Sequence, residues 1–208
     1  MPNPRSIVIA IGGLHGTGKS TYAKILAMDF GLRHVSAGQL FREIAREKNV
    51  TLEALNERAC SDSSLDQLID NRTKEEVAKG GAIVDGQLAA AMAGEKADLR
   101  ILITAPEKVR IERISLRDSI PFDEAREKTV QREHAERRRY LEYYGIDVSD
   151  ASVYDVVIDS SSTSIEEATK ILKSVVEDYI AKQSSEMKRN AGDRNRKNLR
   201  KNIWQREE

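Results

Sequence analysis

Residues 7–20 read Ile7-Val8-Ile9-Ala10-Ile11-Gly12-Gly13-Leu14-His15-Gly16-Thr17-Gly18-Lys19-Ser20. The first five residues are apolar and mostly β-branched, and two glycines end the run, a pattern typical of a strand buried on both faces of a parallel sheet. From Lys19 onward, apolar residues recur at spacings of three and four as far as Phe30, and Gly31 follows as a stop signal. The stretch therefore predicts a buried strand, a glycine-rich loop and a helix.

The loop matches the phosphate-binding motif G-x-x-x-x-G-K-[ST] from Gly13 to Ser20. Its glycines let successive backbone N–H groups converge on an anion, and the helix N-terminus adds the positive end of its dipole. Lys19 is expected to reach the β- and γ-phosphates of ATP, and the Ser20 hydroxyl to ligate Mg²⁺. We do not expect a catalytic role for His15, because this position tolerates many side chains. The expected nucleotide-binding residues are Gly12, Gly13, Leu14, His15, Gly16, Thr17, Gly18, Lys19, Ser20 and Thr21.

Strand and helix patterns alternate along the rest of the chain. Short apolar runs near residues 34–35 and at 82–84, 99–103 and 156–158 predict four more strands. Helical patterns cover about 38–48, 51–60 and 64–79, and two further helices begin after Pro106 and at Ser164, where Glu167 completes a capping box. Five strands that alternate with helices predict a doubly wound α/β fold around a five-stranded parallel sheet.

Composition bounds the function classes. The chain has 208 residues, 39% of them hydrophobic, which suits one catalytic domain with appendages. The 34 basic and 34 acidic residues cancel, so no overall field attracts nucleic acid or an anionic membrane. The single cysteine, Cys60, excludes an internal disulfide and a multi-cysteine zinc site and fits a reducing compartment. We expect a cytoplasmic protein, since the apolar run at 7–11 is too short for a signal peptide or a membrane span. We also expect a monomer, although nothing in the sequence fixes the oligomeric state.

The segment from Ser36 to Arg42 narrows the class. The sequence has neither an Asn-Lys-x-Asp tetrapeptide that reads guanine nor a Leu-Ser-Gly-Gly signature of transporter ATPases, which leaves small kinases as the leading class. Ser36-Ala37-Gly38-Gln39-Leu40-Phe41-Arg42 resembles the Ser-x-Gly-x-x-x-Arg segment of nucleoside monophosphate kinases. The resemblance implies that Ser36 and Gly38 lie near the acceptor nucleoside and that Arg42 binds its phosphate. Without the resemblance, Arg42 reads as a solvated helix residue.

Asp85 ends the predicted strand at 82–84, where phosphate-loop proteins keep the carboxylate that orients Mg²⁺. We therefore expect Ser20 and Asp85 as metal ligands and Asp85 near the acceptor; the alternative is a residue that caps a turn. The resembling kinases carry an arginine directed at the acceptor phosphate where this chain has Gln87. Glutamine cannot supply charge to a phosphate. Either neighbouring arginines compensate or the acceptor differs.

An arginine-rich segment follows at residues 107–145, with eight of the chain's twenty arginines between Arg110 and Arg139. Arg132, Glu136 and Arg139 lie at i, i+4 and i+7, on one face of a helix. This spacing is similar to that of a lid in cytidylate kinases, and the stretches 140–147 and 154–159 resemble those of the archaeal-type enzymes. The resemblance implies that the arginines contact phosphates in catalysis and that Glu136 contacts cytosine. The alternative is a surface ladder of ion pairs. Helix-surface charge is the expected explanation for Arg110, Arg113 and Arg117.

The predicted organisation is a kinase domain at 1–182 and a basic tail at 183–208. Within the domain, acceptor-binding helices cover about 38–80 and a lid about 113–147. The tail is expected to be disordered or weakly helical, because it has few large apolar residues. The resemblance implies ATP-dependent phosphorylation of CMP and dCMP. Two alternatives stay open: another acceptor such as AMP, UMP or dTMP, and an RNA- or ribosome-associated ATPase whose tail contacts RNA.

Overall fold

The computed structural model describes the backbone of residues 7–204, and the side chains of these residues except 60, 61 and 186–204. Its centre is one parallel sheet with the strand order β2-β3-β1-β4-β5. The predicted five-stranded parallel sheet is therefore confirmed. The strands are β1 (Val8–Gly12), β2 (Arg33–Ser36), β3 (Ala82–Asp85), β4 (Leu99–Thr104) and β5 (Val156–Asp159).

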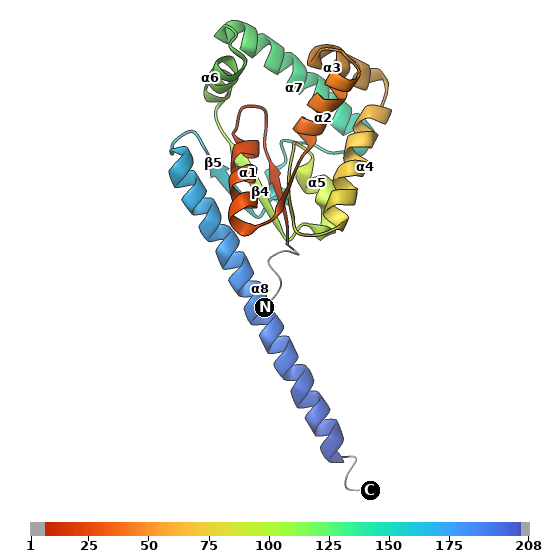
Figure 1. Cartoon of the computed structure of the whole chain (residues 1–208), viewed down its shortest axis with the longest axis vertical. Helices are drawn as coiled ribbons and strands as arrows, with labels where there is room; N and C mark the ends of the chain where they lie inside the picture. The colour runs from red at the N-terminus through yellow and green to blue at the C-terminus, as the bar shows by residue number, and fades with distance from the viewer. Residues whose placement is uncertain (1–6, 205–208) are drawn as a thin grey trace.

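Helices cover both faces of the sheet (Figure 1). On one face, α1 and α8 pack against Ile9 and Ile11 of β1, and on the other α4 and α5 pack against Val8 and Ala10. The alternate burial of β1 side chains explains why its sequence is apolar throughout. The helices are α1 (Lys19–Phe30), α2 (Ala37–Glu47), α3 (Leu52–Ser61), α4 (Ser64–Ala78), α5 (Ala89–Ala93), α6 (Glu107–Asp118), α7 (Phe122–Tyr144) and α8 (Ile165–Trp204).

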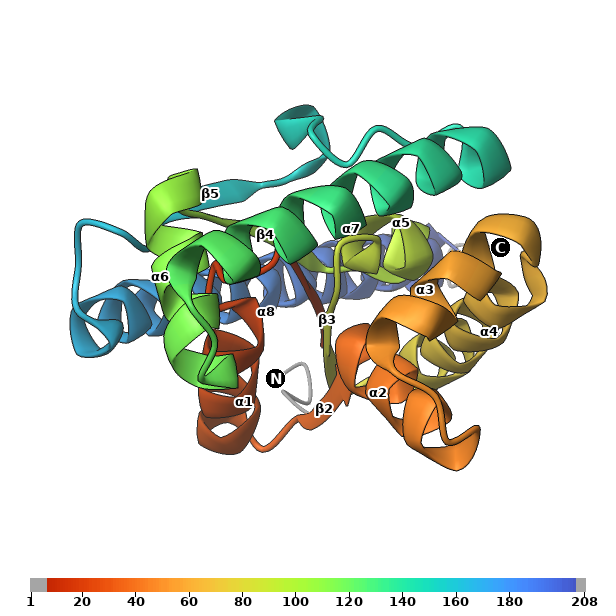
Figure 2. The same ribbon diagram turned by 90° about the horizontal axis from the view of Figure 1, so that it is seen from above.

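Two smaller cores lie outside the sheet. Helices α2, α3 and α4 share a cluster that includes Phe41, Leu55 and Ile69, and α6 and α7 share one around Ile111 and Ala125. Seen from above, α7 crosses over the sheet from α6 toward α3 (Figure 2). The carboxyl ends of the strands and the glycine-rich loop thus lie beneath α7.

The expected single helical segment at 107–145 is broken in the structure. Ser119 has a left-handed backbone, with φ 56°, and Pro121 precedes the first turn of α7. Proline suits a helix start because its missing N–H has no partner there. The capping box of α8 is confirmed, since Ser164 N–H donates to Glu167 at 3.0 Å and Glu167 N–H donates to Ser164 Oγ at 3.2 Å.

Helix α8 extends past the layered body (Figure 1). Its backbone is helical to Trp204, so residues 183–204 take the helical one of the two conformations expected for the tail. Lysine, arginine, glutamine and alanine favour helix, and they account for nine of the 22 residues of this segment. Among the described helices, none is long and apolar enough to cross a membrane.

Candidate active site

The glycine-rich loop connects β1 to α1 as its sequence predicts. Gly13, Gly16 and Gly18 all have positive φ angles, a backbone region that side chains with a Cβ rarely adopt. A Cβ on Gly13 would lie 2.4 Å from the carbonyl oxygen of Ile103, and one on Gly16 would lie 2.4 Å from that of Arg110. The loop is therefore wedged between β4 and α6, which fixes its position relative to the sheet.

Lys19 lies at the start of α1 and donates from Nζ to the carbonyl oxygen of Leu14 at 3.1 Å. Burial lowers the pKa of Lys19, and the carboxylates of Asp85 and Glu136 act against that shift. An ammonium group held by a carbonyl and two nearby carboxylates is in place to bind a phosphate.

The remaining residues of the loop have structural contacts. Leu14 and Thr17 belong to the same loop, where Thr17 Oγ1 donates to Leu14 O at 3.0 Å. Gly12 lies against the Tyr154 hydroxyl, and Thr21 is exposed in the first turn of α1.

Asp85 lies at the carboxyl end of β3 and gathers three partners. Ser20 Oγ donates to it at 2.7 Å, Ser36 Oγ donates at 3.2 Å, and the His34 ring nitrogen Nε2 lies 2.5 Å away. Burial raises the pKa of Asp85, but the hydrogen bonds from His34 and Ser20 and the charge of Lys19 outweigh it and lower the pKa. Asp85 is therefore ionised at neutral pH. Sequence reasoning missed His34, because its link to Asp85 depends on β2 and β3 being neighbours.

The oxygens of Ser20 and Asp85 fit a magnesium ion. Mg²⁺ prefers hard oxygen ligands, and in nucleotide enzymes it takes one or two from the protein and the rest from phosphates and water. The two side chains converge at the foot of the loop, and the carboxylate carries its charge. No group of three or more potential metal-ligating side chains occurs within the described part of the chain.

Arg42 faces the same region from α2. No ion pair of Arg42 with a carboxylate occurs among the described residues, and its Nη1 would lie 3.5 Å from a Cβ placed on Gly38. Burial lowers the pKa of Arg42, and the charges of Arg117 and Arg132 lower it further. Three guanidiniums that repel one another form a site that an anion would stabilise. Ser36, beside them, caps α2 by accepting a hydrogen bond from Gln39 N at 3.3 Å.

Glu136 of α7 is the centre of a hydrogen-bond network and is only 3% exposed. Arg132 Nε donates to its Oε1 at 2.7 Å, which is the i, i+4 ion pair that the sequence left open as an alternative. His15 Nε2 lies 2.7 Å from its Oε2, and Gln87 Nε2 donates to the same oxygen. Burial raises the pKa of Glu136, but the contacts with His15 and Arg132 outweigh it and hold the pKa far below its ordinary value. The tertiary fold thus gives His15 and Gln87 a shared partner that the sequence did not reveal.

Arg139 has different neighbours from Arg132. Its Nε donates to Asp66 at 2.5 Å and its Nη1 donates to Asn56 at 3.2 Å, which ties α7 to α4 and α3. This position differs from the expectation that Arg132 and Arg139 lie together over the phosphates of ATP. The physical reason is the rise of the helix: the seven residues from Arg132 to Arg139 advance about 10.5 Å along α7, which carries Arg139 onto the acceptor-binding helices.

Arg110 is also corrected, because it is buried rather than a surface charge. Its Nη1 donates to Glu133 Oε1 at 2.6 Å and to the carbonyl oxygen of His15 at 2.8 Å. Glu133 in turn accepts a hydrogen bond from the backbone N–H of His15 at 3.2 Å. Arg113 donates to Ser160 Oγ at 2.9 Å. Arg110 thus fixes α6 to the phosphate-binding loop and to α7. Only the tertiary structure identifies this role.

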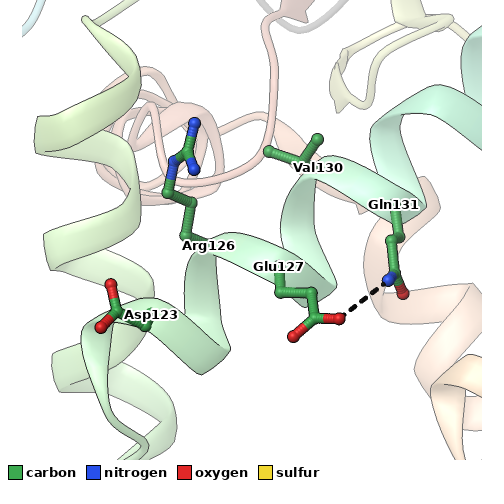
Figure 3. A pocket seen from close by; sticks show the side chains of 5 residues that line it. All are labelled: Asp123, Arg126, Glu127, Val130 and Gln131. Carbon is green, nitrogen blue, oxygen red and sulfur yellow. Dashed lines mark hydrogen bonds between the residues drawn. The ribbon is translucent and has the colours of Figure 1, made fainter.

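A hollow on the surface lies along α7, away from these residues (Figure 3). Its lining is mixed in charge and comes from α7 alone, and one internal hydrogen bond runs from Gln131 to Glu127. None of the residues of the loop, the Asp85 cluster or the Glu136 network lines it. The candidate catalytic and binding residues therefore lie under α7 and not in this hollow. The residues that line the hollow are Asp123, Arg126, Glu127, Val130 and Gln131.

The matching family model and the matching relatives indicate the same family. A sequence model of the cytidylate kinase-like family matches residues 8–162. A protein named cytidylate kinase from Staphylothermus marinus is 42% identical over 174 residues, which cover 84% of this chain and 98% of the relative. Relatives of the same name from Desulfurococcus amylolyticus and Methanocaldococcus jannaschii are also 42% identical and are covered to 98% of their lengths.

Solved structures agree on the fold. A shikimate kinase from Bacteroides thetaiotaomicron superposes with a TM-score of 0.55 at 14% identity, over 82% of this chain and 98% of that one. An uncharacterized protein from Eubacterium ventriosum gives a TM-score of 0.61 at 18% identity, with the same coverage. At these identities the likeness shows the α/β fold alone.

Proposed function

Because this chain belongs to the cytidylate kinase-like family, we propose that it transfers the γ-phosphoryl group of ATP to CMP and dCMP. The observation that carries the proposal is the convergence, under α7, of a phosphate-binding loop, an ionised carboxylate and a group of arginines close enough to repel one another. Such an arrangement matches a reaction that brings two phosphorylated substrates together. We place the enzyme in pyrimidine nucleotide metabolism and propose that it is a monomer. Its single cysteine supports a location in the cytoplasm.

Catalysis in this proposal is positioning and electrostatic stabilisation. The loop N–H groups and Lys19 hold the β- and γ-phosphates of ATP, and Arg42 holds the acceptor phosphate. Arg132, which lies within electrostatic reach of both Lys19 and Arg42, stabilises charge on the transferred group. The helices α6 and α7 exclude water, so that ATP is not hydrolysed. No covalent intermediate with the protein is required.

Ser20 and Asp85 would hold Mg²⁺ in this proposal. The ion would neutralise phosphate charge and keep the transferring group in line. His34 holds Oδ2 of the Asp85 carboxylate, whereas Ser20 and Ser36 both donate to Oδ1, so the carboxylate is fixed in place next to the Ser20 hydroxyl. Arg139 keeps a structural role here, since its bonds to Asp66 and Asn56 hold α7 against the acceptor-binding helices.

Glu136 is proposed to select the base. Cytosine carries an exocyclic amino group that donates hydrogen bonds, whereas uracil carries a carbonyl oxygen at the same place. An ionised carboxylate attracts the first and repels the second. Since Glu136 is buried, contact with a base requires the Arg132 side chain, which is 30% exposed, to shift.

The test of the proposed function is a coupled assay of ADP release with ATP and a panel of CMP, dCMP, AMP, UMP, dTMP and RNA. We expect activity with CMP and dCMP and little with the others. Activity that depends on RNA and not on CMP would establish the ATPase alternative instead.

Replacing Glu136 with Gln tests the base contact within the same panel. The amide keeps the shape but both donates and accepts, so we expect a large loss of kcat/KM for CMP and a narrower ratio of CMP to UMP. Binding of ATP should stay intact. An unchanged ratio together with a lower melting temperature would make Glu136 a structural partner of Arg132.

A further inference from the structure

Three side chains from three separate segments meet at one carboxylate oxygen. His15 comes from the phosphate-binding loop, Gln87 from the turn after β3, and Glu136 from α7. The Nε2 atoms of His15 and Gln87 lie 3.0 Å from each other, and each lies within hydrogen-bond distance of Glu136 Oε2. The junction therefore links the loop that faces ATP to the residue proposed to face the base.

The positions of the protons follow from the charge of Glu136. An ionised carboxylate only accepts hydrogen bonds, so His15 must carry its proton on Nε2 to bond with it. Burial lowers the pKa of His15, and a neutral imidazole has a single N–H, which this contact assigns to Nε2. The His15 and Gln87 nitrogens are then two donors that share one acceptor, rather than partners of each other.

These donors leave Glu136 with one open acceptor position. Among the described residues, Oε2 accepts from both His15 and Gln87, whereas Oε1 accepts only from Arg132 Nε. A carboxylate oxygen has two lone-pair directions, so the second direction on Oε1 stays free. Both donors on Oε2 are neutral, so they fix the plane of the carboxylate without adding a second cation that would reduce its attraction for an amino group.

We propose that His15 and Gln87 are positioning residues that hold the Glu136 carboxylate in the orientation in which it accepts a hydrogen bond from the cytosine amino group. The inference rests on the proposed function. It assigns a positioning role to Gln87, at the position where the resembling kinases carry an arginine. It also assigns to His15 a role that is separate from phosphate binding.

The experiment measures kcat/KM for CMP and for UMP at saturating ATP in His15→Phe, His15→Gln and Gln87→Met. Phenylalanine and methionine keep the side-chain volume and remove the donor, and glutamine at position 15 reaches as far as the imidazole Nε2 and keeps it. We expect the CMP-to-UMP ratio to fall roughly tenfold in His15→Phe and in Gln87→Met, the scale of one hydrogen bond to a charged group. His15→Gln should keep the ratio within about threefold of the original chain.

Gln131→Met is the matched control, because Gln131 on α7 also donates to a glutamate, at 3.2 Å, but lies outside the network (Figure 3). Its ratio should not change. In a Glu136→Gln background, His15→Phe should change the ratio no further, since the residue it positions is already altered.

Equal losses of kcat/KM for CMP and UMP in His15→Phe and Gln87→Met would overturn the proposal and leave the two residues a structural role. If His15→Phe does not fold, Gln87→Met decides alone, because Gln87 lies outside the phosphate-binding loop. Absence of any CMP preference in the unaltered protein would instead reject the proposed function. A CMP preference that Glu136→Gln removes and the other variants keep would reject only the positioning role.

Discussion

At the scale of single residues, the site depends on charges that burial would ordinarily disfavour. Lys19, Asp85 and Glu136 are all removed from water, and each stays charged because an opposite charge or a hydrogen-bond donor lies beside it. Asp85 and Glu136 each have several hydrogen-bond donors, so both keep most of their stabilising contacts when Lys19 is replaced. Function and stability can therefore be separated at Lys19.

Lys19→Ala separates the two effects most clearly. The lysine charge acts on phosphates and contributes no side chain to a hydrophobic core, so we expect kcat to fall at least about 10²-fold while the melting temperature changes little. Lys24→Ala, an exposed lysine on the same helix, is the control and should keep full turnover. Near-native turnover in Lys19→Ala would contradict the assignment of the loop.

At the scale of elements, two ion pairs link α6 to α7 in very different surroundings. The Arg110 and Glu133 side chains are 6% and 16% exposed, whereas those of Arg126 and Glu107 are 58% and 49% exposed. Breaking a buried pair leaves an uncompensated charge, and the cost is much larger than for a solvated pair. The two pairs therefore form a natural comparison within one helix–helix contact.

We expect Arg110→Met to lower the free energy of unfolding by about 3 kcal/mol or more, and Arg126→Met by less than about 1 kcal/mol. Urea denaturation of both variants beside the original chain measures the difference. Similar costs for the two variants would mean that water reaches the Arg110–Glu133 pair. Arg110→Met should also weaken ATP binding, because Arg110 holds the carbonyl oxygen of His15.

The capping box of α8 predicts a pH dependence with a definite sign. Hydrogen bonds from the backbone N–H and the hydroxyl of Ser164 lower the pKa of Glu167 below its ordinary value of 4.5. A carboxyl whose pKa is lower in the folded state adds stability at pH above 4.5 and loses it as the pH falls through the folded pKa. An NMR titration should show Glu167 below 4.5 and, in Ser164→Ala, shifted back toward it. A Glu167 pKa of about 4.5 in the unaltered protein would contradict the capping box between Ser164 and Glu167.

At the scale of the whole molecule, the body of the kinase ends before the chain does. Ala168, Leu172 and Val176 of α8 pack in the core beside Ile9 and Ile11, and Tyr179 and Ile180 are the last residues with described side chains that contact this cluster. The Staphylothermus marinus relative is covered to 98% of its length by only 84% of this chain. We therefore keep the proposed boundary of the kinase domain at about residue 182.

Deleting residues 185–208 should leave kcat and the melting temperature nearly unchanged, because the contacts of α8 with the core end before the cut. The CMP assay and a thermal melt of the truncated protein measure both. A truncated protein that no longer phosphorylates CMP would place the tail in the active site and move the proposed domain boundary.

The sequence by itself determined the parallel five-stranded sheet, the phosphate-binding loop and the position of Asp85 at the end of a strand. Each of these depends on a local pattern: a β-branched run, a glycine spacing, or a polar residue at the end of a strand. Only the tertiary structure decided that His34 contacts Asp85, that Arg110 is buried, and that Arg139 contacts the acceptor-binding helices rather than Arg132's neighbours. These contacts join residues 23 to 95 positions apart, and no local periodicity records which elements become neighbours when the sheet and the helices pack together.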